Sequence, residues 1–215
     1  MDTARTPPEA RTFALLETMR LEQGRLRRLE RHLSRAAAAA RDFDYVWDEP
    51  TVRGALAGAE AAHTDGCWRA RLLVSRDGVP AVECTPHDPA GDGAWRVGLA
   101  PDPIDGRDPF IQHKTTHRAV YEGARRSRPD LDDVLLWNGR GEVTEFTVGN
   151  VVAEIGGVRW TPPLRCGLLA GTFRAEQLDA GAIRERVLTK ADVASAARLW
   201  IINSVREWVD ATLVR

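Results

Sequence analysis

The sequence predicts an α+β protein, in which strand-forming and helix-forming segments follow one another irregularly along 215 residues. Short alternating apolar runs between Gly, Pro, Asn and Asp predict strands, and segment 29–43 has apolar residues at steps of three and four, as in a helix with one buried face. Segment 101–110 is rich in Pro, Gly and Asp and is typical of a linker. We therefore expect a small α/β domain over 1–103 and a larger, β-rich domain over 104–215.

The first domain is expected to begin with a strand and a tight turn at Gln23-Gly24. An acid and a proline open its second helix, and Asp77-Gly78 is a strong hairpin signal between two alternating segments. The predicted elements are a strand at 12–22, a short strand at 25–28, helices at 29–43 and 49–63, and strands at 67–76, 79–85 and 94–100.

The second domain contains more predicted strands than helices. Gly156-Gly157 predicts a turn between two of its strands, and Gly171 precedes a helix. The predicted elements are a helix at 115–124, strands at 132–138, 149–155 and 158–161, a helix after Gly171, a strand at 183–188, a short helix at 191–197 and strands within 198–214.

Composition excludes several classes of function. The formal net charge is -1 and the arginines alternate with acids, which argues against a nucleic-acid or membrane partner. The three cysteines are far apart without a CxxC spacing, so neither a disulfide framework nor a metal site is predicted. Without a signal-like or membrane-spanning apolar segment, we expect a cytoplasmic protein.

Lys114 is one of only two lysines in a chain with 30 lysines and arginines together. Arginine matches lysine as a solubilising charge but cannot be deprotonated to serve as an amine nucleophile. Lys114 is therefore a candidate for a chemical role, although an ordinary exposed charge would also explain it. Lys190 we interpret as an exposed charge at a helix start.

Three features together match the needs of an enzyme that uses pyridoxal phosphate. Lys114 offers an amine for a Schiff base, Glu145 offers an acid that keeps the pyridine ring protonated, and the Gly171-Thr172 turn opens a helix whose N–H groups can hold a phosphate. Each feature also has an ordinary explanation, as a solvated turn acid or a plain helix start. Their joint occurrence makes the cofactor a hypothesis.

Segments 13–37, 113–124, 138–174 and 199–208 resemble the class IV pyridoxal phosphate enzymes of fold type IV. The order of an acid, Gly-Asn, Thr-Pro-Pro and then Gly-Thr before a helix is specific for this family. It contains branched-chain and D-amino-acid aminotransferases and 4-amino-4-deoxychorismate lyase. The resemblance implies a two-domain fold, pyridoxal 5'-phosphate as cofactor, a small-molecule substrate and a homodimer with its sites near the interface.

The resemblance also implies a role for each matching position. Lys114 corresponds to the Schiff-base lysine, Glu145 to the partner of the pyridine nitrogen, Arg35, Gly171, Thr172, Phe173 and Ser204 to the phosphate-binding residues, and Thr18 to a catalytic threonine of the lyases. A strand-forming residue at Thr18 and a turn hydroxyl at Ser204 remain alternatives. His113, His117 and Arg118 flank the lysine without an assigned role.

The chain departs from the family pattern in two places, and the first departure, together with the segments 113–116 and 165–169, favours the lyase. The chain starts without the strand and Asp-Arg-Gly segment that usually come first, as in lyase-like domains fused behind aminodeoxychorismate synthase, so a functional link to that synthase is expected. The tyrosine that aminotransferases carry five residues after the lysine is replaced by Ala119, and Tyr121 is not its match. An aminotransferase acting on a branched-chain or D-amino acid, and a non-catalytic interaction protein on the same fold, remain alternatives.

Overall fold

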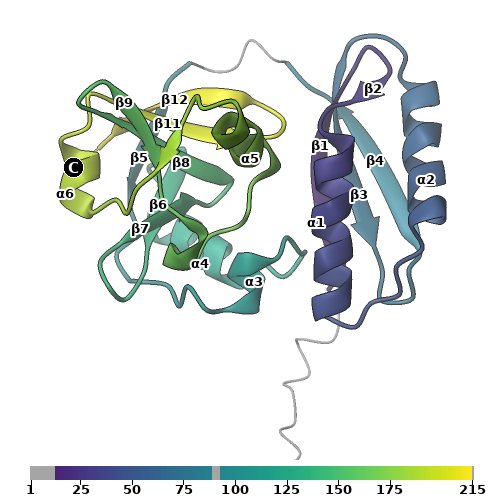
Figure 1. Ribbon diagram of the computed structural model, residues 1–215, viewed down its shortest axis with the longest axis horizontal. Coiled ribbons are helices and arrows are strands. Elements are labelled where there is room, and N and C mark those ends of the chain that lie inside the picture. The colour runs from purple at the N-terminus through teal and green to yellow at the C-terminus, as the bar shows by residue number, and fades with distance from the viewer. Residues whose placement is uncertain (1–12, 89–92, 215) are drawn as a thin grey trace, which may run out of the picture.

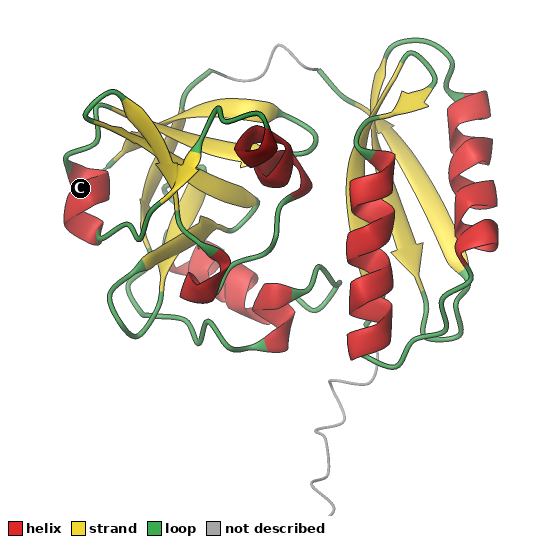
Figure 2. Ribbon diagram, viewed as in Figure 1, coloured by secondary structure: helices red, strands yellow, loops and turns green. Residues whose placement is uncertain are grey.

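The computed structural model describes residues 13–88 and 93–214. Its strands form two separate sheets, and Figures 1 and 2 show them as two bodies side by side, the second one larger and richer in strands. The predicted α+β class is confirmed. The expected absence of the family's usual first strand concerns residues before Phe13, which lie outside the described residues.

The first sheet is antiparallel, with two helices packed against it. Its strand order is β2-β1-β3-β4, with β1 at Leu15–Glu22, β2 at Arg25–Leu26, β3 at Cys67–Val74 and β4 at Pro80–Pro86. Helix α1 spans Leu29–Asp42 and packs along β1, and α2 spans Glu49–Ala62 and packs along β4.

Strand β1 separates the core of this domain from the space between the two domains. Leu15, Met19 and Leu21 alternate on the face that packs into the core. Glu17 lies on that same face and is 2% exposed. Thr18 lies on the opposite face, which is turned towards the second domain and lines a cavity.

The second sheet closes on itself. Its order is β10-β9-β8-β11-β12-β5-β6-β7, and β7 pairs back onto β8. The strands are β5 at Trp95–Leu99, β6 at Asp133–Trp137, β7 at Val143–Phe146, β8 at Gly149–Ile155, β9 at Val158–Thr161, β10 at Arg184–Glu185, β11 at Arg198–Asn203 and β12 at Glu207–Leu213. The resulting ring encloses an apolar core and leaves the ends of its strands to carry functional side chains.

Short helices cover the ends of this ring. They are α3 at Pro109–Gln112, α4 at Ala119–Ser127, α5 at Thr172–Asp179 and α6 at Lys190–Ala194, with a 3-10 turn η2 at Leu164–Cys166. Helix α5 contacts β11 and α4 contacts β6. No helix among the described residues is long and apolar enough to span a membrane.

The domain boundary differs from the expected one at 103/104. Strand β5 pairs in parallel with both β12 and β6, so it is an interior strand of the second sheet. The division between the sheets therefore falls before Trp95. Segment 101–110 then belongs wholly to the second domain, and its last residues begin α3.

Two other elements are shorter than expected. The predicted helix at 115–124 begins only at Ala119, because Thr115 forms an antiparallel bridge with Leu15 and the Thr116 N–H donates to the oxygen of Ala14. A backbone engaged in strand pairing cannot also make helical hydrogen bonds. The predicted strand at 183–188 is limited to β10, which pairs with β9 over two residues.

Candidate active site

A cavity of about 690 Å³ lies between the two domains. The first domain contributes β1 and β3 to its lining, and the second contributes the loop before α4, strand β7, the start of α5 and the turn after β11. Of the predicted site residues, Thr18, Arg35, Lys114, Glu145, Gly171, Thr172 and Ser204 line it. Positions up to 186 residues apart in the sequence numbering, from Thr18 to Ser204, thus share one space.

The backbone at Lys114 is held by the first domain. The Leu16 N–H of β1 donates to the Lys114 oxygen at 3.0 Å, and the next hydrogen bond along this bridge joins Thr116 to Ala14. Burial lowers the pKa of Lys114 to about 8, and the nearby guanidinium groups of Arg35 and Arg118 act in the same direction. A lysine with this pKa is neutral in a useful fraction of molecules near neutral pH.

Glu145 lies on β7 and is 3% exposed. Its carboxylate accepts hydrogen bonds from the Tyr121 hydroxyl at 2.8 Å, from the Leu169 N–H at 3.1 Å and from the Asn150 amide at 3.4 Å. Burial raises the pKa of Glu145 to about 7, although the hydrogen bonds from Tyr121 and Leu169 and the positive charge of Lys114 oppose the shift. A cationic group next to Glu145 would stabilise the ionised form of this buried carboxylate.

Hydroxyl groups and backbone N–H groups meet at the start of α5. Gly171 caps this helix without a side-chain hydrogen bond, so the first N–H groups have no capping side chain. A Cβ on Gly171 would lie 1.9 Å from Asn150 Oδ1, which explains why glycine is needed at this close approach. The hydroxyls of Thr172 and Ser204 lie here and both contact His32 Nε2, at 3.1 and 2.7 Å.

Arg35 reaches the same helix start from α1. Its Nη1 donates to the oxygen of Ala170 at 2.9 Å, and its Nε and Nη2 donate to the Glu17 carboxylate at 2.8 and 2.6 Å. His32 Nδ1 lies 2.6 Å from Glu17 Oε2, the oxygen that also accepts from Arg35 Nη2. Burial alone would raise the pKa of Glu17, but Arg35 and His32 together lower it to about 2.

Phe173 is near the site without its ring lining the cavity. The ring is 3% exposed and packs edge-on against Trp208, with centroids 6.1 Å apart. Its place at the second position of α5 leaves only its N–H at the helix start. A role of Phe173 in binding a phosphate through this N–H stays a prediction.

Four polar residues of the site were assigned no role from the sequence, namely Glu17, His32, Tyr121 and Asn150. The sequence could have indicated Glu17, because it alternates with Leu15, Met19 and Leu21 and therefore falls on the core face of the strand. Such a group needs charged partners. Tyr121 had been set aside because its spacing from Lys114 does not match the aminotransferase tyrosine, yet its hydroxyl contacts Glu145.

The remaining candidates have other surroundings. His113 contacts Asp42 at 3.2 Å, the His117 ring lies 4.2 Å from that of Phe110, and Arg118 lines the cavity. Lys190 differs from the expected exposed charge, because its amine lies 3.0 Å from the centre of the Trp137 ring and is half-buried. No cysteine forms a disulfide, and the described residues contain no metal-binding cluster.

Comparison with known proteins gives consistent matches along nearly the whole chain. The family model for amino-transferase class IV matches residues 14–214. A Schizosaccharomyces pombe protein, provisionally named as an aminodeoxychorismate lyase, is 32% identical over 209 residues, which are 93% of this chain and 89% of that protein.

Solved structures match in the same way. A protein from Mesorhizobium loti, provisionally named as an amino-acid aminotransferase, is 36% identical, with a TM-score of 0.87 and coverage of 94% of this chain and 100% of that one. A hypothetical aminotransferase from Mycobacterium tuberculosis in its PLP-bound form is 25% identical, with a TM-score of 0.79 and coverage of 93% and 81%.

Proposed function

Because this chain belongs to the class IV aminotransferase family, we propose that it is a pyridoxal phosphate dependent lyase that converts 4-amino-4-deoxychorismate to 4-aminobenzoate and pyruvate. The family depends on pyridoxal phosphate, and its members act on small molecules. One observation carries the proposal, which is that a lysine, a buried carboxylate and an uncapped helix start surround a single cavity. The name of the yeast relative supports the lyase over other reactions.

The residues of the cavity fit this cofactor. The N–H groups at the start of α5, the hydroxyls of Thr172 and Ser204 and the guanidinium of Arg35 together form a donor set suited to a phosphate. Glu145 would pair with the protonated ring nitrogen. When bound, pyridoxal phosphate supplies a sink for the electrons left on the substrate carbon.

Lys114 would hold the cofactor covalently until the substrate amine takes its place, and its freed amine would then move the proton. Its pKa of about 8 makes a neutral amine accessible, so Nζ can take the proton from the ring carbon that bears the substrate nitrogen. The bond between the ring and the enolpyruvyl oxygen then breaks, and the ring becomes aromatic. Lys114 or Thr18 returns a proton to the departing group, which leaves as pyruvate, so no oxidant or water is consumed.

Thr18 is the catalytic candidate from the first domain. It lies on the cavity face of β1, directly across from Arg71 in the register with β3. Its hydroxyl has no hydrogen bond within the described part of the chain, so it is available to a ligand. We assign it the orientation of the leaving group.

An aminotransferase is the second candidate, favoured by the 36% identity to the Mesorhizobium loti protein. The two reactions differ in their products. A lyase releases 4-aminobenzoate and pyruvate in equal amounts without a second substrate, whereas an aminotransferase moves the amino group of a branched-chain or D-amino acid to a second substrate, a 2-oxo acid.

The deciding experiment incubates the purified protein and pyridoxal phosphate with enzymatically made 4-amino-4-deoxychorismate. We expect 4-aminobenzoate and pyruvate to appear together. A parallel reaction with branched-chain or D-amino acids and 2-oxoglutarate tests the aminotransferase. A colourless protein that is inactive in both reactions would indicate the third alternative, a non-catalytic interaction protein.

We further propose a cytoplasmic homodimer that works together with aminodeoxychorismate synthase. Dimers are typical of the family, and the synthase makes the substrate of the proposed reaction. Light scattering of the purified protein tests the dimer. The link is tested by the rate of 4-aminobenzoate formation at equal substrate concentration. This rate should be higher when the substrate is made by the synthase in the same reaction than when it is supplied free.

A further inference from the structure

The cavity carries much more positive than negative charge. Its cationic lining residues are Arg35, Arg69, Arg71, Lys114, Arg118 and Arg206, and Glu145 is the one carboxylate among the lining residues that the structure describes. The whole chain has a formal net charge of only -1, so the surplus is local. A concave site with this lining concentrates anions.

Three of the five guanidinium groups in this lining are held by another part of the protein, and two are not. The three that are held are Arg35 with Glu17, Arg71 with Glu83 at 3.7 Å and Arg118 with the Thr147 oxygen at 2.7 Å. Over the described ranges, the side chains of Arg69 and Arg206 make no ion pair or hydrogen bond, and the Arg206 guanidinium lies 5.4 Å from the Trp95 ring centre. Both are therefore free to take a ligand.

These two arginines belong to different domains, and His87 links them. Arg69 lies on β3 and Arg206 in the turn between β11 and β12, while His87 follows β4. Arg69 pairs with Thr85 across β3 and β4, two residues before His87, and Arg69, His87 and Arg206 all line the cavity. Burial lowers the pKa of His87, the positive charges of Arg206, Arg20 and Arg69 lower it further, and the carboxylate of Asp88 opposes this shift. Its Nε2 is buried and has no hydrogen-bond partner in the described structure.

We propose that Arg69 and Arg206, together with His87 Nε2, form a carboxylate-binding site that holds the substrate at the end remote from its amine. A guanidinium group can donate two parallel hydrogen bonds to a carboxylate, and a neutral imidazole can add a third. The substrate class is thus an amine with a distant carboxylate. This inference rests on the proposed function, whose substrate has a ring carboxylate opposite its amino group.

The site also explains how the first domain takes part in substrate binding. One carboxylate held by Arg69 and Arg206 would contact both sheets at once, so binding it would hold β3 against the turn after β11. The phosphate of the cofactor and the carboxylate of the substrate would then bind at separate places in the cavity. Neither arginine is needed for the proton transfers assigned to Lys114.

The test uses protein saturated with pyridoxal phosphate and the ligand 4-aminobenzoate, which keeps the carboxylate opposite the amine. Calorimetry compares its binding to wild type, Arg69→Gln and Arg206→Gln. We expect each substitution to weaken binding by roughly tenfold or more, the scale for loss of a charge-assisted hydrogen bond. Aniline, which lacks the carboxylate, should bind weakly and equally to all three proteins.

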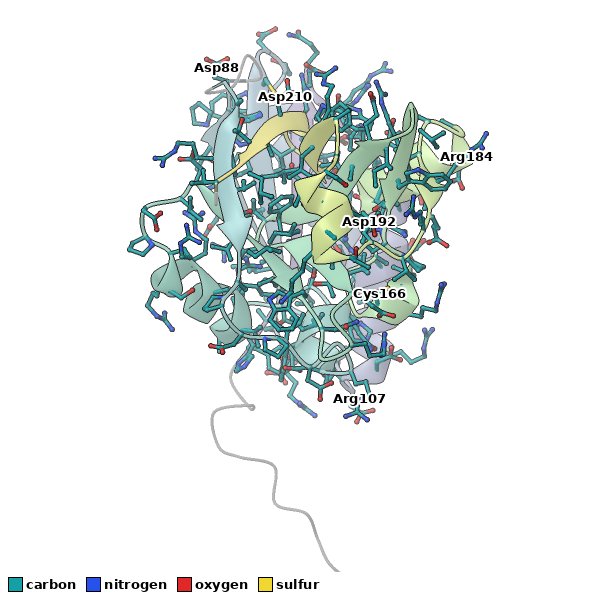
Figure 3. All side chains as sticks on the ribbon, turned by 90° about the vertical axis from the view of Figure 1, so that its left-hand side faces the viewer. Asp88, Arg107, Cys166, Arg184, Asp192 and Asp210 are labelled. Carbon is teal, nitrogen blue, oxygen red and sulfur yellow. The ribbon has the colours of Figure 1, made fainter. Side chains whose placement is uncertain are left out.

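Arg198→Gln is the matched control. Arg198 lies on β11 outside the cavity lining and pairs with Asp210 of β12 at 2.9 Å, where Figure 3 labels Asp210. This variant should bind 4-aminobenzoate as wild type does. Unchanged binding in Arg69→Gln and Arg206→Gln, equal losses for aniline, or no saturable binding to wild type would each overturn the proposal.

The outcome is separable from that of the proposed function. Binding that depends on both arginines in a protein without lyase activity would keep the carboxylate site and reject the lyase. Lyase activity with a wild-type KM in both variants would keep the lyase and reject the site. Circular dichroism and the visible absorbance of the cofactor verify that each variant is folded and loaded.

Discussion

The hydroxyl of Tyr121 donates a hydrogen bond to Oε1 of Glu145 at 2.8 Å. Tyr121 lies on α4 and Glu145 on β7, and the two side chains are 7% and 3% exposed. The bond therefore joins a helix that covers the ring of strands to the buried acid of the site. The spacing of Tyr121 from Lys114 gave no indication of this contact.

Tyr121→Phe is expected to shift the pH profile of turnover. The hydroxyl stabilises the ionised carboxylate, so its loss raises the pKa of Glu145 above its present value of about 7. Glu145 is proposed to act when ionised, and the acidic limb of the profile should therefore move to higher pH by roughly half to one unit. An unmoved limb would separate Tyr121 from the function of Glu145.

Glu145→Gln should lower turnover by about 10² or more, because it keeps the shape but removes the charge that stabilises the protonated ring. Cofactor should still bind. The measurement is the rate at saturating pyridoxal phosphate. Glu142→Gln, which changes an acid paired with Arg140 outside the cavity, is the control and should be nearly neutral. Unchanged turnover in Glu145→Gln would remove this residue from its role.

Lys114→Arg should abolish the covalent fixing of cofactor by borohydride, since arginine has no nucleophilic amine. Lys190→Arg should leave the covalent labelling intact, because Lys190 is the first residue of α6 and its amine lies over the Trp137 ring, outside the cavity lining. Peptide mapping of the reduced wild-type protein identifies the labelled residue. Label on Lys190, or label that persists in Lys114→Arg, would contradict the assignment.

Arg35→Ala should weaken cofactor binding by about 1.5 to 3 kcal/mol, the usual contribution of a charged hydrogen bond. Titration of the apoprotein with pyridoxal phosphate measures this, and excess cofactor should restore activity. Arg31→Ala, about one turn earlier on α1 in an exposed pair with Asp179, should have no effect. An unaltered affinity in Arg35→Ala would place this guanidinium outside the phosphate site.

Glu17→Gln should make stability less dependent on acid pH. In the native protein Arg35 and His32 lower the pKa of Glu17 to about 2 from an ordinary value of 4.5. The stabilisation from the ionised form is therefore complete above about pH 4.5 and is lost as pH falls towards 2. Urea unfolding between these pH values should show a shallower decline for the variant. Parallel declines would mean that Glu17 does not contribute this dependence.

Most helices and strands could be predicted because periodicity and turn residues are local signals. The sheet to which β5 belongs could not be predicted, because its partners β12 and β6 follow it far along the chain and the sequence of a strand does not indicate its neighbours. In the same way, Lys114, Glu145 and Thr172 were proposed as site residues from motifs, and all three line one cavity. The contact between Tyr121 and Glu145 depends on how α4 packs, which no spacing rule states.

The bridge between β1 and the loop of Lys114 joins residues distant in sequence, as in the hydrogen bond from the Ala14 N–H to Thr116 Oγ1 across 102 positions. Closing so long a chain segment costs entropy before any contact offsets it, and such contacts slow folding. The backbone of the lysine thus reaches its final position only when the two ends of this segment have met. We therefore expect a folding chain to gain the capacity to bind cofactor only after β1 has paired with the loop of Lys114.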